Sequence, residues 1–392
     1  MNMRIVADQD IVAIDDSFHN LGELIKIPGR ELNRSDLINA DALLVRSISM
    51  VDEKLLKGTA VRFVGSATAG TDHVDQVFLQ RQGIEFSHAE GCNANAVVEY
   101  CFTALALLDF RLDLQLADKT FAIIGAGHIG GLFATKLAKL GFRCLVCDPF
   151  LSKQRKVELK KLNCLLVNID HALKADVISL HVPLTTSGKY STLHLLSEAN
   201  LRHLNPGAVL INTSRGAVIH NADLLRVLDE RSDLVTIMDV WESEPDIDTE
   251  LLGRVNLASP HIAGYSTEAK LSATTKLAQD LCRFFSINPE LNSSIGCSGR
   301  TFIPKKLGGR MPKGEDRLCS ALLDRVLSLS NTDDLFRREF KLNTGNSAEI
   351  FDKLRKLLVN RHEFSAYEVP MGSLEPQQIR LLSVLGFKLQ AM

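Results

Sequence analysis

The chain has 392 residues, of which 45% are hydrophobic and 23% are charged, and its formal net charge is −2. This length is more than one compact core usually contains, so we expect two or three domains. From Arg300 onward the chain has 16 basic and 11 acidic residues, an excess that a solvated face or a phosphate-bearing small molecule explains as well as nucleic acid does, and we expect no nucleic-acid partner. The longest apolar stretch, from Ala94 to Phe110, is interrupted by Asn95 and Glu99 and is too short to span a bilayer, so we expect no membrane partner either.

Eight cysteines are scattered without the regular spacing of a disulfide framework, which is typical of proteins in a reducing cytoplasm. Residues 1–8 place a short apolar run against acidic residues, and this pattern predicts a buried first strand and not a signal peptide. Both observations predict a cytoplasmic protein.

Short apolar runs alternate with helical segments over residues 4–93. They predict a small open α/β domain that spans residues 1–93 and is completed by a helix within residues 266–286. Arg46 and Ser47 follow one expected strand and Thr68 follows another, at the carboxyl ends where open α/β sheets bind ligands. An ordinary loop explains these residues equally well on local evidence. The expected strands are 5–7, 24–27, 42–45, 61–64 and 84–86, and the expected helices are 35–39, 52–56 and 72–82.

Residues 94–265 are expected to form a second α/β domain. Its first strand runs into Gly125, Gly127 and Gly130, and a segment with helical periodicity follows. Gly125 would let the chain turn, Gly127 would let the backbone approach a pyrophosphate, and Gly130 would let the helix pack on its strand. Helix N–H groups would then face the phosphates. Such a glycine pattern is weak evidence by itself, because surface turns produce it by chance.

Asp148 strengthens this interpretation. It ends the next expected strand, eighteen residues after Gly130 (148 − 130). An acidic residue there can accept hydrogen bonds from the adenosine ribose hydroxyls and would repel a 2′-phosphate. We therefore predict that the cofactor is NAD and not NADP. The alternative is a solvated strand end in an ordinary α/β protein.

Strand and helix continue to alternate up to residue 265, which predicts a doubly wound (Rossmann) parallel sheet with right-handed crossovers. Residues 286–300 are rich in Asn, Ser, Gly and Pro and predict a linker, and residues 287–392 as a whole predict a small C-terminal α+β domain. The further expected strands are 177–182, 208–213, 234–238, 255–258 and 366–369, and the further expected helices are 168–174, 197–203, 221–230, 267–285, 316–329 and 377–385.

Three residues stand at the downstream ends of consecutive expected strands, namely Arg215, Glu244 and His261. They should therefore meet at the sheet edge that holds the pyrophosphate. An arginine can clamp a carboxylate with two parallel hydrogen bonds. A histidine can exchange a proton near neutral pH, and a neighbouring glutamate can fix its tautomer. Each residue alone has an ordinary structural explanation, but together they suit hydride transfer from a 2-hydroxy acid, with the redox chemistry supplied by the cofactor.

These residues also carry a family resemblance. Segments 125–130, 181–185, 211–216, 239–245 and 260–264 resemble the successive signatures of the D-isomer-specific 2-hydroxyacid dehydrogenases. The resemblance extends over about residues 5–285. It implies that Arg215 anchors the substrate, that His261 is the acid/base and that Glu244 supports it. It also implies that NAD is contacted by Asp148, Asp239 and Gly264.

Further segments resemble a branch of this family that acts on a phosphorylated hydroxy acid. The resemblance implies that Ser47, Thr68 and Tyr265 contact the substrate. It also implies that the chain forms a homodimer through its C-terminal domain, residues 287–392. The segments concerned are 45–47, 65–73, 91–100, 261–265, 351–355 and 385–387.

A phosphorylated acid carries a carboxylate and a phosphate, so a second cationic group is needed besides Arg215. We hypothesise that Arg46 contributes to the phosphate site, and Arg355 or Arg361 could reach it from the tail. The predicted function is the NAD-dependent oxidation of such an acid to a 2-oxo acid. The alternatives are a dehydrogenase for another 2-hydroxy acid, such as 3-phosphoglycerate, and an NAD-sensing binding protein.

Overall fold

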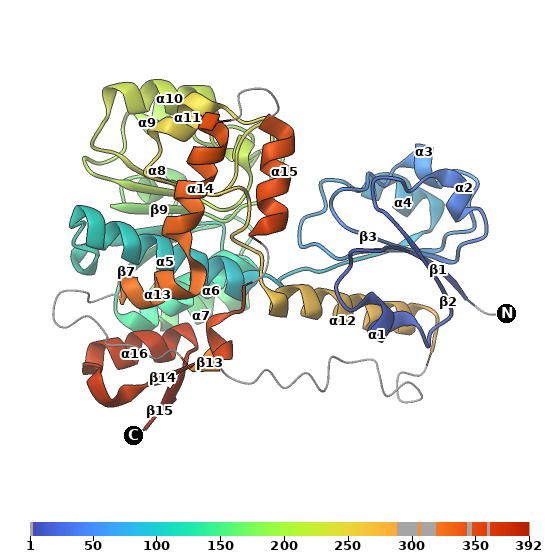
Figure 1. The fold of residues 1–392 in the computed structure, drawn as a ribbon. Helices are drawn as coiled ribbons and strands as arrows, with labels where there is room; N and C mark the ends of the chain where they lie inside the picture. Colours follow the sequence, from blue (N-terminus) through green and yellow to red (C-terminus); the bar gives the residue numbers. More distant parts are fainter. Residues whose placement is uncertain (1–2, 288–304, 307–318, 343–346, 359–360, 392) are drawn as a thin grey trace. The chain divides into compact units, whose positions relative to one another are not determined.

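The computed structural model describes residues 3–287, 305–306, 319–342, 347–358 and 361–391 (Figure 1). The contacts divide the chain into two units, residues 1–93 with 267–303 and residues 94–266 with 304–392, and each is considered by itself. The expected linker, residues 286–300, lies outside the described residues from residue 288 onward. No helix in these described ranges is both long and apolar enough to cross a membrane.

The first unit is built on a parallel five-stranded sheet in the order β2-β1-β3-β4-β5. Its strands agree closely with those expected from the apolar runs. The central strand β3 is buried at all four positions, because helices cover both faces of the sheet. One face packs on α12 through Leu277 and Leu281, and the other packs on α4 through Phe78. The strands are β1 (Arg4–Asp8), β2 (Glu23–Ile27), β3 (Ala42–Val45), β4 (Phe63–Ser66) and β5 (Glu85–His88), and the helices are α1 (Ile14–Phe18), α2 (Arg34–Leu37), α3 (Glu53–Leu56), α4 (Gln76–Gln82) and α12 (Thr267–Phe284).

The second unit contains a parallel seven-stranded sheet in the order β12-β11-β10-β9-β6-β7-β8. The chain runs outward from β6 through β7 to β8, returns to β9 beside β6, and then continues in the other direction. This is the doubly wound arrangement predicted from the sequence, with its switch point between β6 and β9, where such folds bind dinucleotides. The strands are β6 (Thr120–Ile124), β7 (Arg143–Cys147), β8 (Leu165–Leu166), β9 (Val177–Leu180), β10 (Val209–Asn212), β11 (Val235–Met238) and β12 (Leu257–Ala258).

Most helices of this unit were expected, but α7, α11 and two helices of the tail, α14 (Leu329–Leu342) and α15 (Ser347–Leu357), were missed. The sequence of α7 is KQRKVELKK, in which only Leu159 is buried, so it lacks the apolar period that predicts a helix. By contrast, α5 is buried along most of its length and forms the centre of the unit. The helices are α5 (Ala94–Leu112), α6 (His128–Leu140), α7 (Lys153–Lys161), α8 (Ile169–Ala172), α9 (Glu198–Leu201), α10 (Asn221–Glu230) and α11 (Thr249–Arg254).

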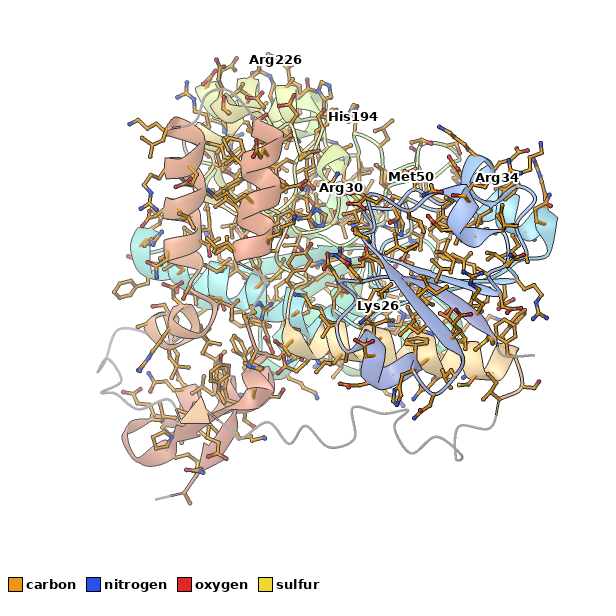
Figure 2. The ribbon with its side chains drawn as sticks, turned by 45° about the vertical axis from the view of Figure 1, so that its right-hand side comes forward. Lys26, Arg30, Arg34, Met50, His194 and Arg226 are labelled. Atoms are coloured by element: carbon orange, nitrogen blue, oxygen red, sulfur yellow. The ribbon has the colours of Figure 1, made fainter. Side chains whose placement is uncertain are left out.

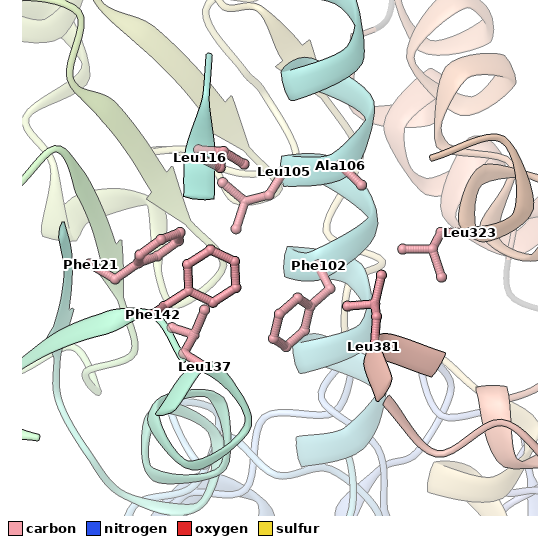
Figure 3. Close-up of a pocket in the computed structure, with 9 residues that line it drawn as sticks. All are labelled: Phe102, Leu105, Ala106, Leu116, Phe121, Leu137, Phe142, Leu323 and Leu381. Atoms are coloured by element: carbon pink, nitrogen blue, oxygen red, sulfur yellow. The ribbon is translucent and has the colours of Figure 1, made fainter. Parts of the chain in front are cut away.

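The described parts of the tail pack within this second unit. Figure 3 shows Leu323 of α13 and Leu381 of α16 beside Phe102 of α5, around a small pocket whose lining is entirely apolar. Such a pocket offers no polar group for a cofactor or a charged substrate, so we assign it to the core. The tail elements are β13 (Lys305–Lys306), α13 (Ser320–Leu327), α14 (Leu329–Leu342), α15 (Ser347–Leu357), β14 (Tyr367–Pro370), α16 (Pro376–Leu385) and β15 (Lys388–Gln390), and β13-β14-β15 form a parallel sheet.

Candidate active site

The loop between β6 and α6 has the geometry of a phosphate cradle. Gly125 has a φ of +85°, and a Cβ there would lie 2.5 Å from the carbonyl oxygen of His181. A Cβ on Gly130 would lie 1.9 Å from the carbonyl oxygen of Gly125. At Gly127, in contrast, a Cβ would meet no protein atom within 4 Å. Gly127 is also the N-cap of α6 and supplies no capping side chain, so no side chain of the N-cap competes with a ligand at the start of this helix.

This difference between the glycines gives a prediction about cofactor binding. Gly127→Ala is expected to weaken NAD binding by about tenfold or more while leaving the melting temperature nearly unchanged, because the new methyl group would meet no protein atom and would occupy space that the pyrophosphate needs. Gly130→Ala should lower the melting temperature, since its methyl group meets the backbone. Calorimetric titration with NAD and thermal melts of both variants test this. Equal effects of the two substitutions on stability would contradict it.

Asp148 links the end of β7 to this glycine loop. Its Oδ2 accepts the backbone N–H of Ala126 at 2.8 Å, and its Oδ1 accepts the N–H of Phe150 at 2.8 Å. Each carboxylate oxygen has a second lone pair, so ribose hydroxyls can still donate to this residue. The proposed contact with NAD is therefore compatible with the structural role of Asp148.

His261 and Glu244 are brought together, as their positions after β12 and β11 suggested. The ring Nδ1 of His261 lies 2.7 Å from Oε2 of Glu244, and Oε1 of Glu244 accepts the N–H of Trp241 at 2.7 Å. Because a carboxylate only accepts, Nδ1 carries a proton, and Nε2 is left to exchange a proton with a substrate.

The charge state of Glu244 follows from its surroundings. Burial raises the pKa of its carboxyl, but the charge and hydrogen bond of His261, the N–H of Trp241 and the charge of Arg355 together hold that pKa below its ordinary value. Glu244 is therefore ionised at neutral pH, and its negative charge stabilises an imidazolium at His261.

Asp239 shapes the loop that carries His261. The Asp239 side chain is almost completely buried and accepts hydrogen bonds from Ser259 Oγ at 2.6 Å, from Ile262 N at 2.8 Å and from Ala263 N at 2.9 Å. Burial raises the pKa of Asp239, and these donors and the charge of His261 oppose that rise. The sequence suggested only an NAD contact for Asp239. That contact remains a proposal, and Oδ2 of Asp239, which accepts the N–H of Ala263, has a second lone pair for it.

Arg215 follows β10, and the glycine after it fixes its position. Arg215 Nη1 donates to the carbonyl of Ser214 at 2.8 Å. A Cβ on Gly216 would lie 1.8 Å from the backbone carbon of Trp241, so the two backbones are in direct contact. The loop that carries Arg215 is thus packed on the segment that leads to Glu244. The sequence around Gly216 gave no sign of this contact, because Trp241 lies 25 residues further along the chain (241 − 216).

Three tail residues hold the loop that follows His261. Arg361 Nη2 donates to the carbonyl of Ala263 at 3.0 Å, and Ser266 Oγ donates to Glu363 Oε1 at 2.9 Å. Arg355 Nη2 donates to the hydroxyl of Tyr265 at 2.5 Å. The sequence named both arginines only as candidates for reaching the substrate and did not identify Glu363. No local signal identifies such contacts, because they join distant parts of the chain.

In the first unit, the residues expected to contact substrate follow two adjacent strands, β3 and β4. Ser47 is exposed, while Thr68 Oγ1 lies 2.8 Å from Ser66 Oγ and donates to the carbonyl of Gly70 at 3.1 Å. The guanidinium of Arg46 is paired with two carboxylates, which are Asp8 at 2.9 Å and Asp10 at 2.8 Å. Its charge is therefore largely compensated within the protein, which the sequence did not suggest.

One group of potential metal ligands occurs within the described ranges. His194, His220 and Glu242 place ligand atoms within 4.8 Å of one another. His194, which is labelled in Figure 2, has its Nε2 2.6 Å from Glu242 Oε1, and the other carboxylate oxygen accepts the N–H of Asn221 at 3.0 Å. These bonds join the chain before α9 to the start of α10, and this structural role accounts for the cluster.

Comparison with known proteins identifies the family to which the chain belongs. Residues 108–263 match the family described as "D-isomer specific 2-hydroxyacid dehydrogenase, NAD binding domain". Proteins named erythronate-4-phosphate dehydrogenase from Cellvibrio japonicus and Proteus mirabilis are 38% and 41% identical to the chain, and both alignments cover 98% of it. They cover 100% and 99% of the relatives.

Solved structures of related enzymes share the fold. D-lactate dehydrogenase from Aquifex aeolicus, complexed with NAD and lactic acid, has a TM-score of 0.62 at 22% identity and covers 73% of this chain and 97% of its own. At this identity the likeness concerns the fold alone. NAD⁺-bound 3-phosphoglycerate dehydrogenase from Entamoeba histolytica has a TM-score of 0.60 at 28% identity and covers 73% of this chain and 96% of its own.

Proposed function

Because the chain belongs to the D-isomer specific 2-hydroxyacid dehydrogenase family, we propose that it oxidises the C2 hydroxyl of 4-phospho-D-erythronate to 2-oxo-3-hydroxy-4-phosphobutanoate. In this role it would serve the synthesis of pyridoxal 5′-phosphate, vitamin B6. Its cofactor is NAD. The observation that carries the proposal is the intact His261–Glu244 pair in a chain that aligns over its full length with relatives of that name.

The residues of the second unit suit the chemistry of this oxidation. NAD, when bound, accepts a hydride from C2. We assign to His261 the removal of the hydroxyl proton through Nε2, while ionised Glu244 stabilises the resulting imidazolium. Arg215 would hold the substrate carboxylate with two hydrogen bonds and polarise the developing carbonyl.

The cofactor contacts are proposed from the glycine loop and from three residues that follow strands, Asp148, Asp239 and Gly264. N–H groups at the start of α6 would bind the pyrophosphate, and Asp148 would bind the adenosine ribose. Asp239 and Gly264, which lie on either side of His261 in the sequence, would contact the nicotinamide end of NAD. These assignments are supported by the position of the loops at the carboxyl ends of the strands.

Ser47, Thr68, Tyr265 and Arg46 are the proposed substrate contacts. Arg46→Ala tests the last of these. We expect it to raise the apparent KM by about two- to tenfold and no more, because its charge is already compensated by two carboxylates and less of it is available to a phosphate. Steady-state kinetics would measure this. An unchanged KM would remove Arg46 from the phosphate site.

We also propose that the chain is a homodimer formed through residues 287–392. Two large apolar side chains support this, since Leu342 is 69% exposed and Leu357 is 65% exposed at the ends of α14 and α15. Size-exclusion chromatography with light-scattering detection would measure the molecular mass of the protein in solution. A monomer at micromolar concentration would contradict the proposal.

The experiment that tests the function is substrate-dependent reduction of NAD, followed by absorbance. 4-Phospho-D-erythronate and 3-phosphoglycerate are offered in parallel, each with and without a 2-oxo acid that can recycle the cofactor. We expect reduction with the first compound only. Reduction with 3-phosphoglycerate instead would mean that the chain acts on the substrate named for its structural neighbour from Entamoeba histolytica, which is 28% identical. Reduction with neither, in a protein shown to bind NAD, would favour a sensor or a different hydroxy acid.

A further inference from the structure

Arg355 brings a positive charge from the tail to the loop that follows His261. Its Nη2 donates to the hydroxyl of Tyr265, and its guanidinium carbon lies 5.5 Å from the Tyr265 ring centre and 5.9 Å from that of Phe351. Across the described ranges no carboxylate is in ion-pair contact with it, and its buried Nε has no hydrogen-bond partner. An arginine held in this way by neutral groups retains its capacity for an anion.

Arg361, the other tail arginine near this loop, provides the contrast. Its Nη1 lies 3.1 Å from the buried carboxyl of Glu99. Its Nη2 donates to the carbonyls of Ala96 at 2.6 Å and Ala263 at 3.0 Å. Its guanidinium is therefore engaged by groups of the protein, and we assign it to fastening the tail.

Arg355 is also firmly positioned. On the same helix, α15, Phe351 and Leu354 are buried in a cluster that includes Trp241, next to the segment of Glu244. Figure 1 shows α14 and α15 beside each other on this unit. Burial raises the pKa of Glu244, whereas His261, the N–H of Trp241 and the charge of Arg355 lower it. This places the guanidinium within electrostatic reach of the catalytic pair.

We propose that Arg355 binds the phosphate of the substrate and thereby selects phosphorylated hydroxy acids. This inference rests on the function proposed above. A guanidinium can form two parallel hydrogen bonds to phosphate oxygens, and the faces of Tyr265 and Phe351 keep it oriented. Arg215 would bind the carboxylate at one end of the substrate and Arg355 the phosphate at the other, with C2 presented to His261. Tyr265, which the resemblance assigns to substrate binding, would act together with Arg355.

The test compares 4-phospho-D-erythronate with D-erythronate, which lacks the phosphate. Arg355→Ala is expected to lower kcat/KM for the phosphorylated compound by about 10- to 100-fold, mainly through KM, and to change that for D-erythronate by less than about threefold. Arg355→Lys should give an intermediate loss, since lysine keeps the charge but cannot form two parallel hydrogen bonds to the phosphate. Arg361→Ala is the matched control, and it should lower the melting temperature and affect both compounds alike. Melting curves and NAD titrations establish that each variant is folded.

Equal losses for the two compounds in Arg355→Ala would overturn the proposal and make Arg355 a support for Tyr265. Calorimetric titration of the NAD-loaded protein separates this inference from the proposed function, because it needs no turnover. The wild type should bind the phosphorylated compound more tightly, and Arg355→Ala should reduce that difference by about 10- to 100-fold. If this holds while NAD is not reduced, the phosphate site stands and the proposed reaction fails. If the difference survives undiminished in Arg355→Ala, the phosphate site is elsewhere.

Discussion

His261→Ala is expected to lower kcat by roughly 10²- to 10⁴-fold, the usual contribution of a general base. The reason is geometric, since Nδ1 is engaged by Glu244 at 2.7 Å and Nε2 is the ring atom left to accept the proton from the C2 hydroxyl. NAD affinity should change little, because the proposed cofactor contacts lie on other residues. Stopped-flow measurement of NAD reduction in a single turnover isolates this step from product release.

Glu244→Gln provides the matched variant, because it preserves the size of the side chain and removes its charge. It should lower kcat less than His261→Ala does, since the imidazole remains but its protonated form loses an adjacent anion. Wild-type turnover in His261→Ala, with NAD binding intact, would mean that another group removes the proton.

The elements that the sequence predicted well are those whose signal is local. Buried parallel strands are continuous apolar runs, and the residues that follow them, such as Arg215, Glu244 and His261, can be assigned to one edge of the sheet because all strands point the same way. The glycine loop is equally local, since Gly125 and Gly130 are required by contacts within a few residues or with the adjacent strand end.

The features that escaped prediction depend on side chains far apart in the chain. Tyr265 and Arg355 are separated by 90 residues, and Glu99 and Arg361 by 262. The hydrophobic periodicity of the sequence does not indicate which residues form such distant pairs. The same holds for Arg46, whose compensation by Asp8, 38 residues earlier, depends on the pairing of β1 with β3. Sequence reasoning could therefore name the available cations, but it could not decide which of them are already paired.

Glu99→Ala is expected to destabilise the protein by about 3–5 kcal/mol, because it removes the buried acceptor of the Phe364 N–H and of Arg361 Nη1. Glu99 is 3% exposed on α5, accepts the N–H of Phe364 at 2.9 Å and contacts Arg361 at 3.1 Å. Through the bond from Arg361 to Ala263, the substitution should also loosen the loop of His261 and lower kcat. Thermal melts and kinetics on the same preparation measure both effects. A stability loss without any change in kcat would show that the tail does not support the catalytic loop.

Glu99→Gln separates the charge of this residue from its hydrogen bonds. Burial raises the pKa of Glu99 to about 8, although the charge of Arg361 opposes this. Because the folded-state pKa lies above the unfolded value, the protonated carboxyl stabilises the fold at low pH, and this contribution is lost as the pH rises from about 4.5 to about 8. Glutamine cannot ionise, so the melting temperature of the wild type should fall relative to that of Glu99→Gln across this range. A constant difference between pH 5 and pH 9 would mean that Glu99 ionises at the same pH in the folded and unfolded states, and that Arg361 fully compensates its burial.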